Sequence, residues 1–560
     1  MTAPSRPDGY LALSSDATDT DGAHSEPDSL SHPLLTSPET TGLTLATPHG
    51  GTLTVYPDGE GYTYAYGPTG LSGLLHNSYV FRCAIFASIG GLTFGYDQGV
   101  IANVLVMTDF IQRWPIGSWE KGLMSSALQC FAKSLSQIVL GRAIGGFGVG
   151  ALSMLSPLYM AEISPPEVRG SLMSLEQFSI VLGCVIGFWT GFFTRNIVGS
   201  LSWRVPLGLQ LVPGILLAFG SFFLPPSPRL LVYRGKNDEA LASLAKLRLR
   251  SSQESTSDPL LQIELLEMQV EADLIQQTTG TDDKNRLRNE ALAWARLFDH
   301  KYIDRTLVGV LIMFFQQWSG INALIYYGPM LLQSLGLTGS TVNLLVAGGI
   351  NVVQLIAVFP AILYIDQWGR KPLLRAGSAM MTCSHLAVYE FGGNWTEHSV
   401  AATVSICCLY LFIAAYGMSF GPVGWVLPSE VFPLSMRSKG VSLSTASVWL
   451  NNFLIGLVTP ALMEISASGT FMVFACACFA AYLWSTYVVP ETANVSLEEI
   501  DAVFRSSAGL EDAQLKKQVR AFVFDNHIGA AVLNVETLSP QIERDLGLYD
   551  LIKGLVAGEE

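Results

Sequence analysis

Long apolar stretches alternate with short polar ones along most of this chain, and the pattern predicts membrane-spanning helices. A helix needs about 20 predominantly apolar residues to cross the hydrocarbon of a bilayer. By that measure the spans lie at 78–104, 137–161, 171–194, 205–225, 306–332, 342–365, 373–389, 401–428, 440–463 and 468–489. These ten stretches are rich in glycine, as membrane helices are where backbones approach closely. The pattern therefore predicts an all-α helical bundle in a membrane.

The polar segments predict how the chain is divided. Residues 1–76 are rich in Ser, Thr, Pro, Gly and Asp, and this composition, which cannot bury a core, predicts a disordered arm. Residues 226–305 form a polar insert in which apolar residues recur with helical spacing. Two helical halves are then expected at 77–225 and 306–489, followed by a soluble tail at 490–560.

Charges in the connecting segments predict the orientation in the membrane. The insert at 226–305 contains many Lys and Arg residues, whereas the connections near 330–341 and 390–400 contain none. Because cytoplasmic loops of membrane proteins are enriched in Lys and Arg, we expect the insert and both termini in the cytoplasm. The glycosylation sequon at Asn394 would then lie outside the cell.

Composition narrows the classes of function. Hydrophobic residues make up 49% of the 560 residues and charged residues 14%, with a mean hydropathy of +0.37, which is typical of a polytopic membrane protein. The net charge of -14 argues against a nucleic-acid partner, which would require a basic surface. The eight cysteines lack metal-ligand spacing, so we expect neither a metal nor a cofactor. The sequence shows no nucleophile–base set, so no enzyme class is supported.

One apolar stretch contains a seam of uncharged polar side chains. Residues 314–327 read Phe-Phe-Gln-Gln-Trp-Ser-Gly-Ile-Asn-Ala-Leu-Ile-Tyr-Tyr. Amides are costly in hydrocarbon, so these should face the bundle interior or a wet cavity. Gln316, Gln317 and Asn322 could bond the hydroxyls of a neutral polyhydroxylated ligand, while aromatic rings stack on its apolar faces. Alternatively the amides only join helices, and this stretch alone does not separate the two interpretations.

A repeated motif predicts two related halves. Residues 162–170 read Glu-Ile-Ser-Pro-Pro-Glu-Val-Arg-Gly, and residues 430–440 read Glu-Val-Phe-Pro-Leu-Ser-Met-Arg-Ser-Lys-Gly. Both give a Glu, a turn broken by Pro, an Arg, and a Gly that opens the next helix. In transporters with such parallel repeats the ligand site lies between the halves.

These motifs together resemble the sugar porter family of the major facilitator superfamily, most closely its fungal hexose porters. The resemblance runs from about Phe81 to Phe504. Its motifs lie at 94–100 (Phe-Gly-Tyr-Asp-Gln-Gly-Val), 141–146, 162–169, 225–229, 316–322, 366–371, 421–425 and 490–492. The resemblance implies two pseudo-symmetric helical halves that rock about a central sugar site.

The resemblance implies roles for three sets of residues. The sugar-contacting positions of the family fall on Gln177, Gln316, Gln317, Asn322, Gln354, Trp425, Trp449 and Asn452. A pair that proton-coupled members use falls on Asp97 and Arg142. A cytoplasmic salt-bridge latch falls on Glu162, Arg169, Asp366, Arg370, Glu430 and Arg437. Val448 stands where the family usually has an amide, so one hydrogen bond to the sugar is expected to be missing.

Each set also has a purely structural interpretation. The tryptophans could pack against lipid or neighbouring helices. The aspartate–arginine pair could be a structural ion pair, and some facilitators of the family also keep this aspartate. The latch residues could be ordinary cytoplasmic charges, although the repeated Glu-to-Arg spacing favours a latch.

The chain departs from the family between Cys130 and Gln137, where relatives complete a second helix and add a third. We therefore expect two helices to be absent, on the order of 45 residues at about 20 per span. Their loss would remove half of the cytoplasmic latch.

The sequence as a whole predicts a multi-pass plasma-membrane protein that transports a neutral, hexose-like monosaccharide by alternating access. A proton is the expected co-substrate, with facilitated diffusion as the alternative. Two other interpretations remain open. One is a non-transporting sugar sensor on the same fold, which the short tail disfavours, and the other is a truncated, inactive transporter.

Overall fold

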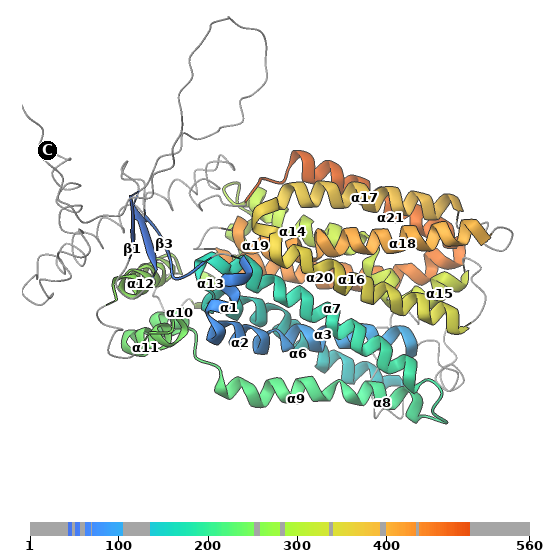
Figure 1. Cartoon of the computed structure of the whole chain (residues 1–560), viewed down its shortest axis with the longest axis horizontal. Coiled ribbons are helices and arrows are strands. Elements are labelled where there is room, and N and C mark those ends of the chain that lie inside the picture. The colour runs from blue at the N-terminus through green and yellow to red at the C-terminus, as the bar shows by residue number, and fades with distance from the viewer. Residues whose placement is uncertain are drawn as a thin grey trace, which may run out of the picture.

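The computed structural model describes residues 43–46, 51–55, 62–68, 70–104, 135–250, 258–279, 286–334, 340–391, 399–432 and 436–492. These residues form a long helical bundle with a small domain at one end, which we call the domain end (Figure 1). Eight helical stretches among them are long and apolar enough to cross a membrane. All ten predicted spans coincide with helical segments. Eight of them correspond to these stretches, and the other two correspond to α6 (Leu135–Ile163) and α17 (Arg370–Phe391).

The first half of the bundle is built around two closely packed helices. Its elements are α2 (Ser78–Ala87), α3 (Ile89–Val104), α6, η1 (Pro166–Val168), α7 (Arg169–Thr194), α8 (Leu201–Leu209), α9 (Leu211–Gly220) and η2 (Ser221–Phe223). Glycines on both α3 and α7 permit the close approach. A Cβ added at Gly95 would lie 1.8 Å from the Ile180 carbonyl oxygen, and one at Gly183 would lie 2.3 Å from that of Leu92. Larger residues at these positions would push the two helices apart.

The second half contains two candidate spans that break partway along their length. Its elements are α14 (Ile303–Trp318), α15 (Ile321–Ser334), α16 (Ser340–Trp368), α17, α18 (Ser399–Met418), α19 (Phe420–Val431), α20 (Arg437–Ile465) and α21 (Ala467–Tyr487). Between α14 and α15, Gly320 adopts a φ of +92°, a conformation that favours glycine. The His385 Nε2 atom lies 2.9 Å from the Ser319 carbonyl oxygen at this break. The second break, at Ser419, separates α18 from α19.

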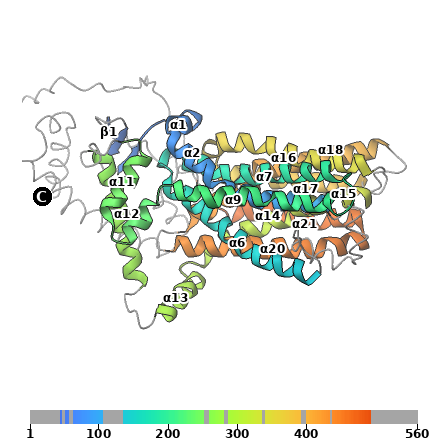
Figure 2. The same cartoon turned by 90° about the horizontal axis from the view of Figure 1, so that it is seen from below.

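The polar insert folds into helices at the domain end. These are α10 (Pro228–Tyr233), α11 (Asn237–Leu247), α12 (Pro259–Thr279), α13 (Arg286–Ala295) and η4 (Arg296–Phe298). Beside α12 lie three antiparallel strands in the order β1 (Leu43–Ala46), β2 (Thr52–Val55) and β3 (Tyr62–Ala65) (Figures 1 and 2). Leu43 pairs with Val55, and Thr52 pairs with Ala65. A short helix, α1 (Gly70–His76), leads into the bundle.

The strands and α1 differ from the disordered arm that the sequence predicts through residue 76. The Tyr66 hydroxyl donates to Glu264 Oε2 at 2.8 Å, and the Tyr64 hydroxyl donates to Glu267 Oε2 at 3.0 Å. Burial, followed by the nearby charge of Glu264, raises the pKa of both phenols, so both remain protonated donors. Tyr64 and Tyr66 dock on α12 through these bonds, and the composition of the chain around them does not reveal that partner.

Arg248 contacts the first half of the bundle and also forms a buried ion pair within the insert. Arg248 Nη2 lies 2.6 Å from Glu264 Oε1, and Arg248 Nη1 donates to the Ile163 carbonyl oxygen at the end of α6 at 2.9 Å. Burial alone would raise the pKa of Glu264, but the Arg248 charge and hydrogen bonds from Arg248 and Tyr66 outweigh it, and the pKa is lowered. Glu264 thus holds the Arg248 side chain that bonds the insert to the end of a membrane helix.

Candidate functional site

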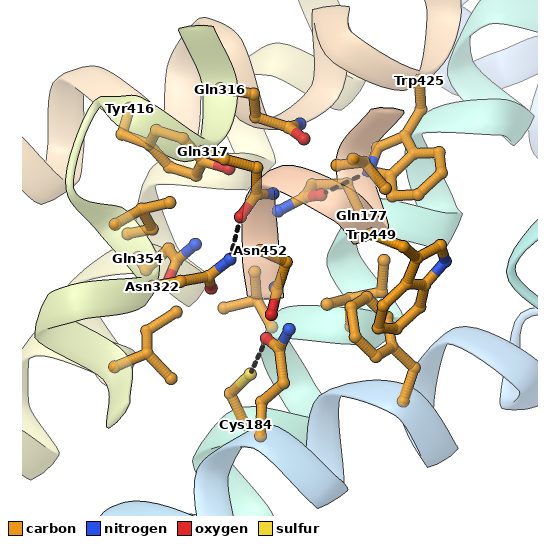
Figure 3. Close-up of a pocket in the computed structure, with 17 residues that line it drawn as sticks. Gln177, Cys184, Gln316, Gln317, Asn322, Gln354, Tyr416, Trp425, Trp449 and Asn452 are labelled. Carbon is orange, nitrogen blue, oxygen red and sulfur yellow. Dashed lines mark hydrogen bonds between the residues drawn. The ribbon is translucent and has the colours of Figure 1, made fainter. Parts of the chain in front are cut away.

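A cavity lies between the two halves of the bundle (Figure 3). Its lining comes from α3 and α7 of the first half and from α14, α15, α16, α18, α19 and α20 of the second. All eight residues that the resemblance places in contact with sugar line this cavity, namely Gln177, Gln316, Gln317, Asn322, Gln354, Trp425, Trp449 and Asn452. The fold thus brings together residues that are far apart in the sequence, from position 177 to position 452.

Two tryptophans in the cavity wall bond the halves to each other. Trp425 Nε1, on α19, donates to Gln177 Oε1, on α7, at 3.0 Å. Trp449 Nε1, on α20, donates to Ser153 Oγ, on α6, at 2.9 Å. Each bond crosses from the second half to the first. The contact between the halves at this depth therefore includes polar groups that a bound ligand could compete for.

Several amides of the second half bond within that half. Asn322 Nδ2 donates to Gln317 Oε1, as Figure 3 shows. Gln316 Nε2 donates to the Phe420 carbonyl oxygen at 3.0 Å, next to the break between α18 and α19. Asn452 Oδ1 accepts from the Tyr326 hydroxyl at 3.0 Å. These bonds join helices and at the same time hold the amides in fixed positions around the cavity.

Gln354 keeps an acceptor free for a ligand. Its side chain is 2% exposed, and its Oε1 atom has no hydrogen-bond partner among the described residues. A buried acceptor left unsatisfied costs about 1–3 kcal/mol. Because Gln354 lines the cavity, a ligand hydroxyl there could remove this cost.

The cavity also contains residues that the sequence did not single out as sugar contacts. These include Phe94, Gln98, Cys184 and Tyr416. Cys184 Sγ donates to Gln98 Oε1 at 3.8 Å. Gln98 lies within the motif at 94–100, and Cys184 follows Gln177 by two helical turns on one face of α7. The motif and the helical spacing could therefore have placed both residues at the site. Val448, which stands where the family usually has an amide, lines the cavity as well and makes this part of the wall apolar.

The structure tests the predicted proton-coupling pair only in part. Asp97 lies in α3 with 8% of its surface exposed, next to the cavity residue Gln98. Arg142 belongs to α6, but its side chain lies outside the described part of the structure. The pairing of Asp97 with Arg142 therefore stays a prediction.

Part of the predicted latch forms a network at the domain end. Arg370 Nη2 lies 2.7 Å from Glu430 Oε1, which joins the start of α17 to α19. The backbone N–H groups of Arg370 and Lys371 donate to the two carboxylate oxygens of Glu491, at 2.8 and 3.1 Å. Thr492 Oγ1 donates to Glu430 Oε2 at 2.6 Å. Glu491 belongs to the motif at 490–492, but the sequence did not assign it to the latch.

The other latch residues lie at the same end of the bundle. Glu162 is in the last turn of α6, Arg169 begins α7 and Arg437 begins α20. Asp366 lies near the end of α16, but its side chain is outside the described part of the structure. Their pairing across the halves stays a prediction.

Comparison with known proteins identifies the family. The family model described as "Sugar (and other) transporter" matches residues 122–504. The low-affinity glucose transporter HXT3 of Saccharomyces cerevisiae is 30% identical over 484 residues, which cover 75% of this chain and 81% of that protein. The high-affinity glucose transporter 1 of Candida albicans is 30% identical over 431 residues, covering 73% and 76%.

The fold is also similar to that of solved transporters. The proton:xylose symporter XylE bound to 6-bromo-6-deoxy-D-glucose has a TM-score of 0.62 and 25% identity, and the match covers 76% of this chain and 99% of that one. The partially occluded inward-open form of XylE from E. coli has a TM-score of 0.58 at 24% identity, covering 75% and 100%.

These matches do not support the predicted loss of the second and third family helices. That expectation concerns residues that lie outside the described structure, between positions 104 and 135. The match to the family model and the helical bundle agree with the reading of a transporter rather than an enzyme. The chain belongs to the sugar transporter family of the major facilitator superfamily and is an integral, multi-pass membrane protein.

Proposed function

We propose that this protein carries a hexose across the plasma membrane by alternating access, with the sugar bound in the cavity between the halves. The uncharged, hydrogen-bonding lining carries this proposal. Among the described residues it contains five glutamines, two asparagines, two tryptophans and a tyrosine, but no charged side chain: Gln98, Gln177, Gln316, Gln317, Gln354, Asn322, Asn452, Trp425, Trp449 and Tyr416. Such a lining suits a neutral ligand with many hydroxyls and apolar ring faces.

The bonds between the halves suggest how sugar binding is linked to rocking. A hydroxyl that accepts from Trp425 Nε1, or donates to Gln177 Oε1, replaces a bond of 3.0 Å that ties α19 to α7. Each such neutral bond contributes only about 0.5–1.5 kcal/mol. The sugar can therefore exchange bonds between the halves for bonds to itself, and the two arrangements stay close in free energy, as alternating access requires.

We further propose that transport is coupled to a proton through Asp97. This carboxyl is buried in the first membrane helix, beside a residue that lines the cavity. Ionisable residues inside a membrane are rare and commonly serve ion pathways. Facilitated diffusion of the same sugar is the alternative, and accumulation against a gradient distinguishes the two.

The test is uptake of radiolabelled glucose in cells that lack their own hexose carriers. We expect Gln317→Ala and Trp425→Ala to raise the half-saturating glucose concentration about 5- to 30-fold, from about 1–2 kcal/mol of lost contacts. Trp294→Ala is the matched control, because Trp294 is 37% exposed on α13, outside the cavity lining. All three variants should reach the cell surface in equal amounts. Normal uptake by both cavity variants would contradict the proposed site.

A further inference from the structure

Glu176 directly precedes the cavity residue Gln177 and is a buried acid without a role in the proposed transport. It lies on α7 with 1% of its surface exposed. A Cβ added at Gly91, on α3, would lie 2.8 Å from its Oε1 atom, so the carboxyl rests directly against the backbone of α3. On its other side lies Ser156 of α6. The carboxyl is therefore enclosed where three elements of the first half meet.

The hydrogen bonds around Ser156 require one more proton than the serine can supply. Ser156 Oγ lies 2.8 Å from Glu176 Oε2 and also 2.8 Å from the carbonyl oxygen of Ala87, at the end of α2. A hydroxyl carries one hydrogen, and a carbonyl oxygen carries none. If Glu176 were ionised, one of these two short contacts would bring buried oxygen acceptors together without a hydrogen between them.

A proton on Glu176 satisfies both contacts. The carboxyl then donates to Ser156 Oγ, and Ser156 donates to the Ala87 carbonyl oxygen. The result is a continuous chain of hydrogen bonds from α7 through α6 to α2. Buried polar groups in folded proteins are nearly always paired in this way.

The charges around Glu176 favour the same protonation state. An ionised carboxylate at such depth needs a cation or several donors. The titratable groups of α3, α6 and α7 include Tyr96, Asp97, Tyr159, Glu162, Arg169 and Cys184. None of them forms an ion pair or hydrogen bond with Glu176 among the interactions of the described residues, nor do the described charged residues of α2, α16 and α19. Asp97 lies six residues beyond Gly91, about 9 Å along α3 at about 1.5 Å per residue.

We propose that Glu176 binds a proton in this conformation and is a second protonation site beside the sugar cavity. The role of Glu176 in transport rests on the proposed function, whereas its protonation does not. Loss of the proton to water would leave Ser156 unable to bond both partners and would loosen α7 from α6 and α2. Gln177, the next residue, bonds Trp425 of the other half. Proton occupancy at Glu176 is thereby linked to the contact between the halves at the sugar site.

Infrared spectroscopy of the full-length protein in lipid tests the protonation state without sugar. At neutral pH we expect a carbonyl band of a protonated carboxylic acid in the wild type and in Asp97→Asn, and its loss in Glu176→Gln. Ser156→Ala should shift the band and keep it, because the carboxyl loses its hydrogen-bond acceptor but not its proton. If the band seen in the wild type remains in Glu176→Gln, the proposal is overturned.

Sugar exchange at equilibrium tests the link to transport. In the wild type, glucose exchange should fall at alkaline pH, approaching about tenfold per pH unit for one proton. In Glu176→Gln the alkaline fall should disappear, because the amide donates to Ser156 at every pH. Ser174→Ala is the matched control: Ser174 is buried two residues away and donates only to the Gly170 carbonyl oxygen, at 2.9 Å. This variant should keep the alkaline fall.

The outcomes separate this proposal from the transport proposal. If Glu176→Gln and the wild type show the same alkaline fall, Glu176 is not linked to transport. If the wild type exchanges no glucose at any pH, the proposed function fails, while the infrared bands still decide whether Glu176 carries a proton.

Discussion

Removing the negative charge of Glu264 should release α12 from Arg248, the residue that contacts the end of α6. The Arg248 side chain is 1% exposed and that of Glu264 is 6% exposed, so the pair is buried. Glu264→Gln keeps an acceptor for Tyr66 but leaves Arg248 charged and buried without its carboxylate. Breaking a buried pair in this way costs roughly 3–5 kcal/mol. At about 1.4 kcal/mol per factor of ten, the ratio of docked to undocked α12 should fall roughly 100- to 4,000-fold.

Hydrogen exchange of the α12 backbone amides measures this ratio directly, since undocking exposes α12 to water. The matched control is Lys236→Gln, which removes the pair between Lys236 Nζ and Glu239 Oε1 at 2.8 Å, whose side chains are 52% and 59% exposed. An exposed pair contributes about 0–1 kcal/mol, so this variant should exchange as the wild type does. Exchange in Glu264→Gln within about twofold of the wild type, well under 1 kcal/mol, would refute the anchoring role.

The same pair predicts how docking depends on pH. The folded pKa of Glu264 is lowered, so its contribution is fully present above the unfolded value of about 4.3 and is lost as pH falls through the folded value. The α12 amides should therefore stay protected at pH 5 and lose protection only in stronger acid. In Glu264→Gln this acid-dependent loss should be absent, because protection is already low at pH 5.

Two further predictions concern the transport cycle. Asp97→Asn should abolish accumulation of labelled glucose in energised vesicles while exchange continues, and full accumulation by this variant would argue for facilitated diffusion instead. Glu430→Gln removes the carboxylate that Arg370 contacts at 2.7 Å and should favour the state that is open at the domain end. A cysteine introduced by Ser429→Cys, beside Met173 of the other half, should then react several-fold faster with an impermeant maleimide than it does without Glu430→Gln. Equal rates would remove Glu430 from the latch.

The sequence predicts those features of the protein that depend on local pattern. Apolar runs locate the membrane helices, and the resemblance to the family assigns both Gln177 and Trp425 to a sugar site; both line the same cavity in the structure. What the sequence misses depends on partners far along the chain. Tyr66 is ordered by Glu264, 198 positions later, and a composition rich in Ser, Thr and Gly gives no sign of that contact. The proton on Glu176 likewise follows from the distances between Ser156 and two acceptors far along the chain.

The insert is attached to the two halves in different ways, and this difference determines what it can do during rocking. Its early part is joined to the first half by Arg248, which pairs with the buried Glu264 and donates to the end of α6. Its last part belongs to the second half, because the buried side chain of Leu297 in η4 packs with Phe432 and Met436.

Between these two attachments, α13 is joined to α20 by the pair of Glu290 Oε1 and Lys439 Nζ, 3.4 Å apart, in which the glutamate side chain is 49% exposed. Such an exposed pair contributes little and can form or break at small cost. The strong attachments therefore lie at opposite ends of the insert, one on each half, with a weak contact between them. When the halves rock, α10–α12 should move with the first half and η4 with the second, so that the displacement is taken up between α12 and η4.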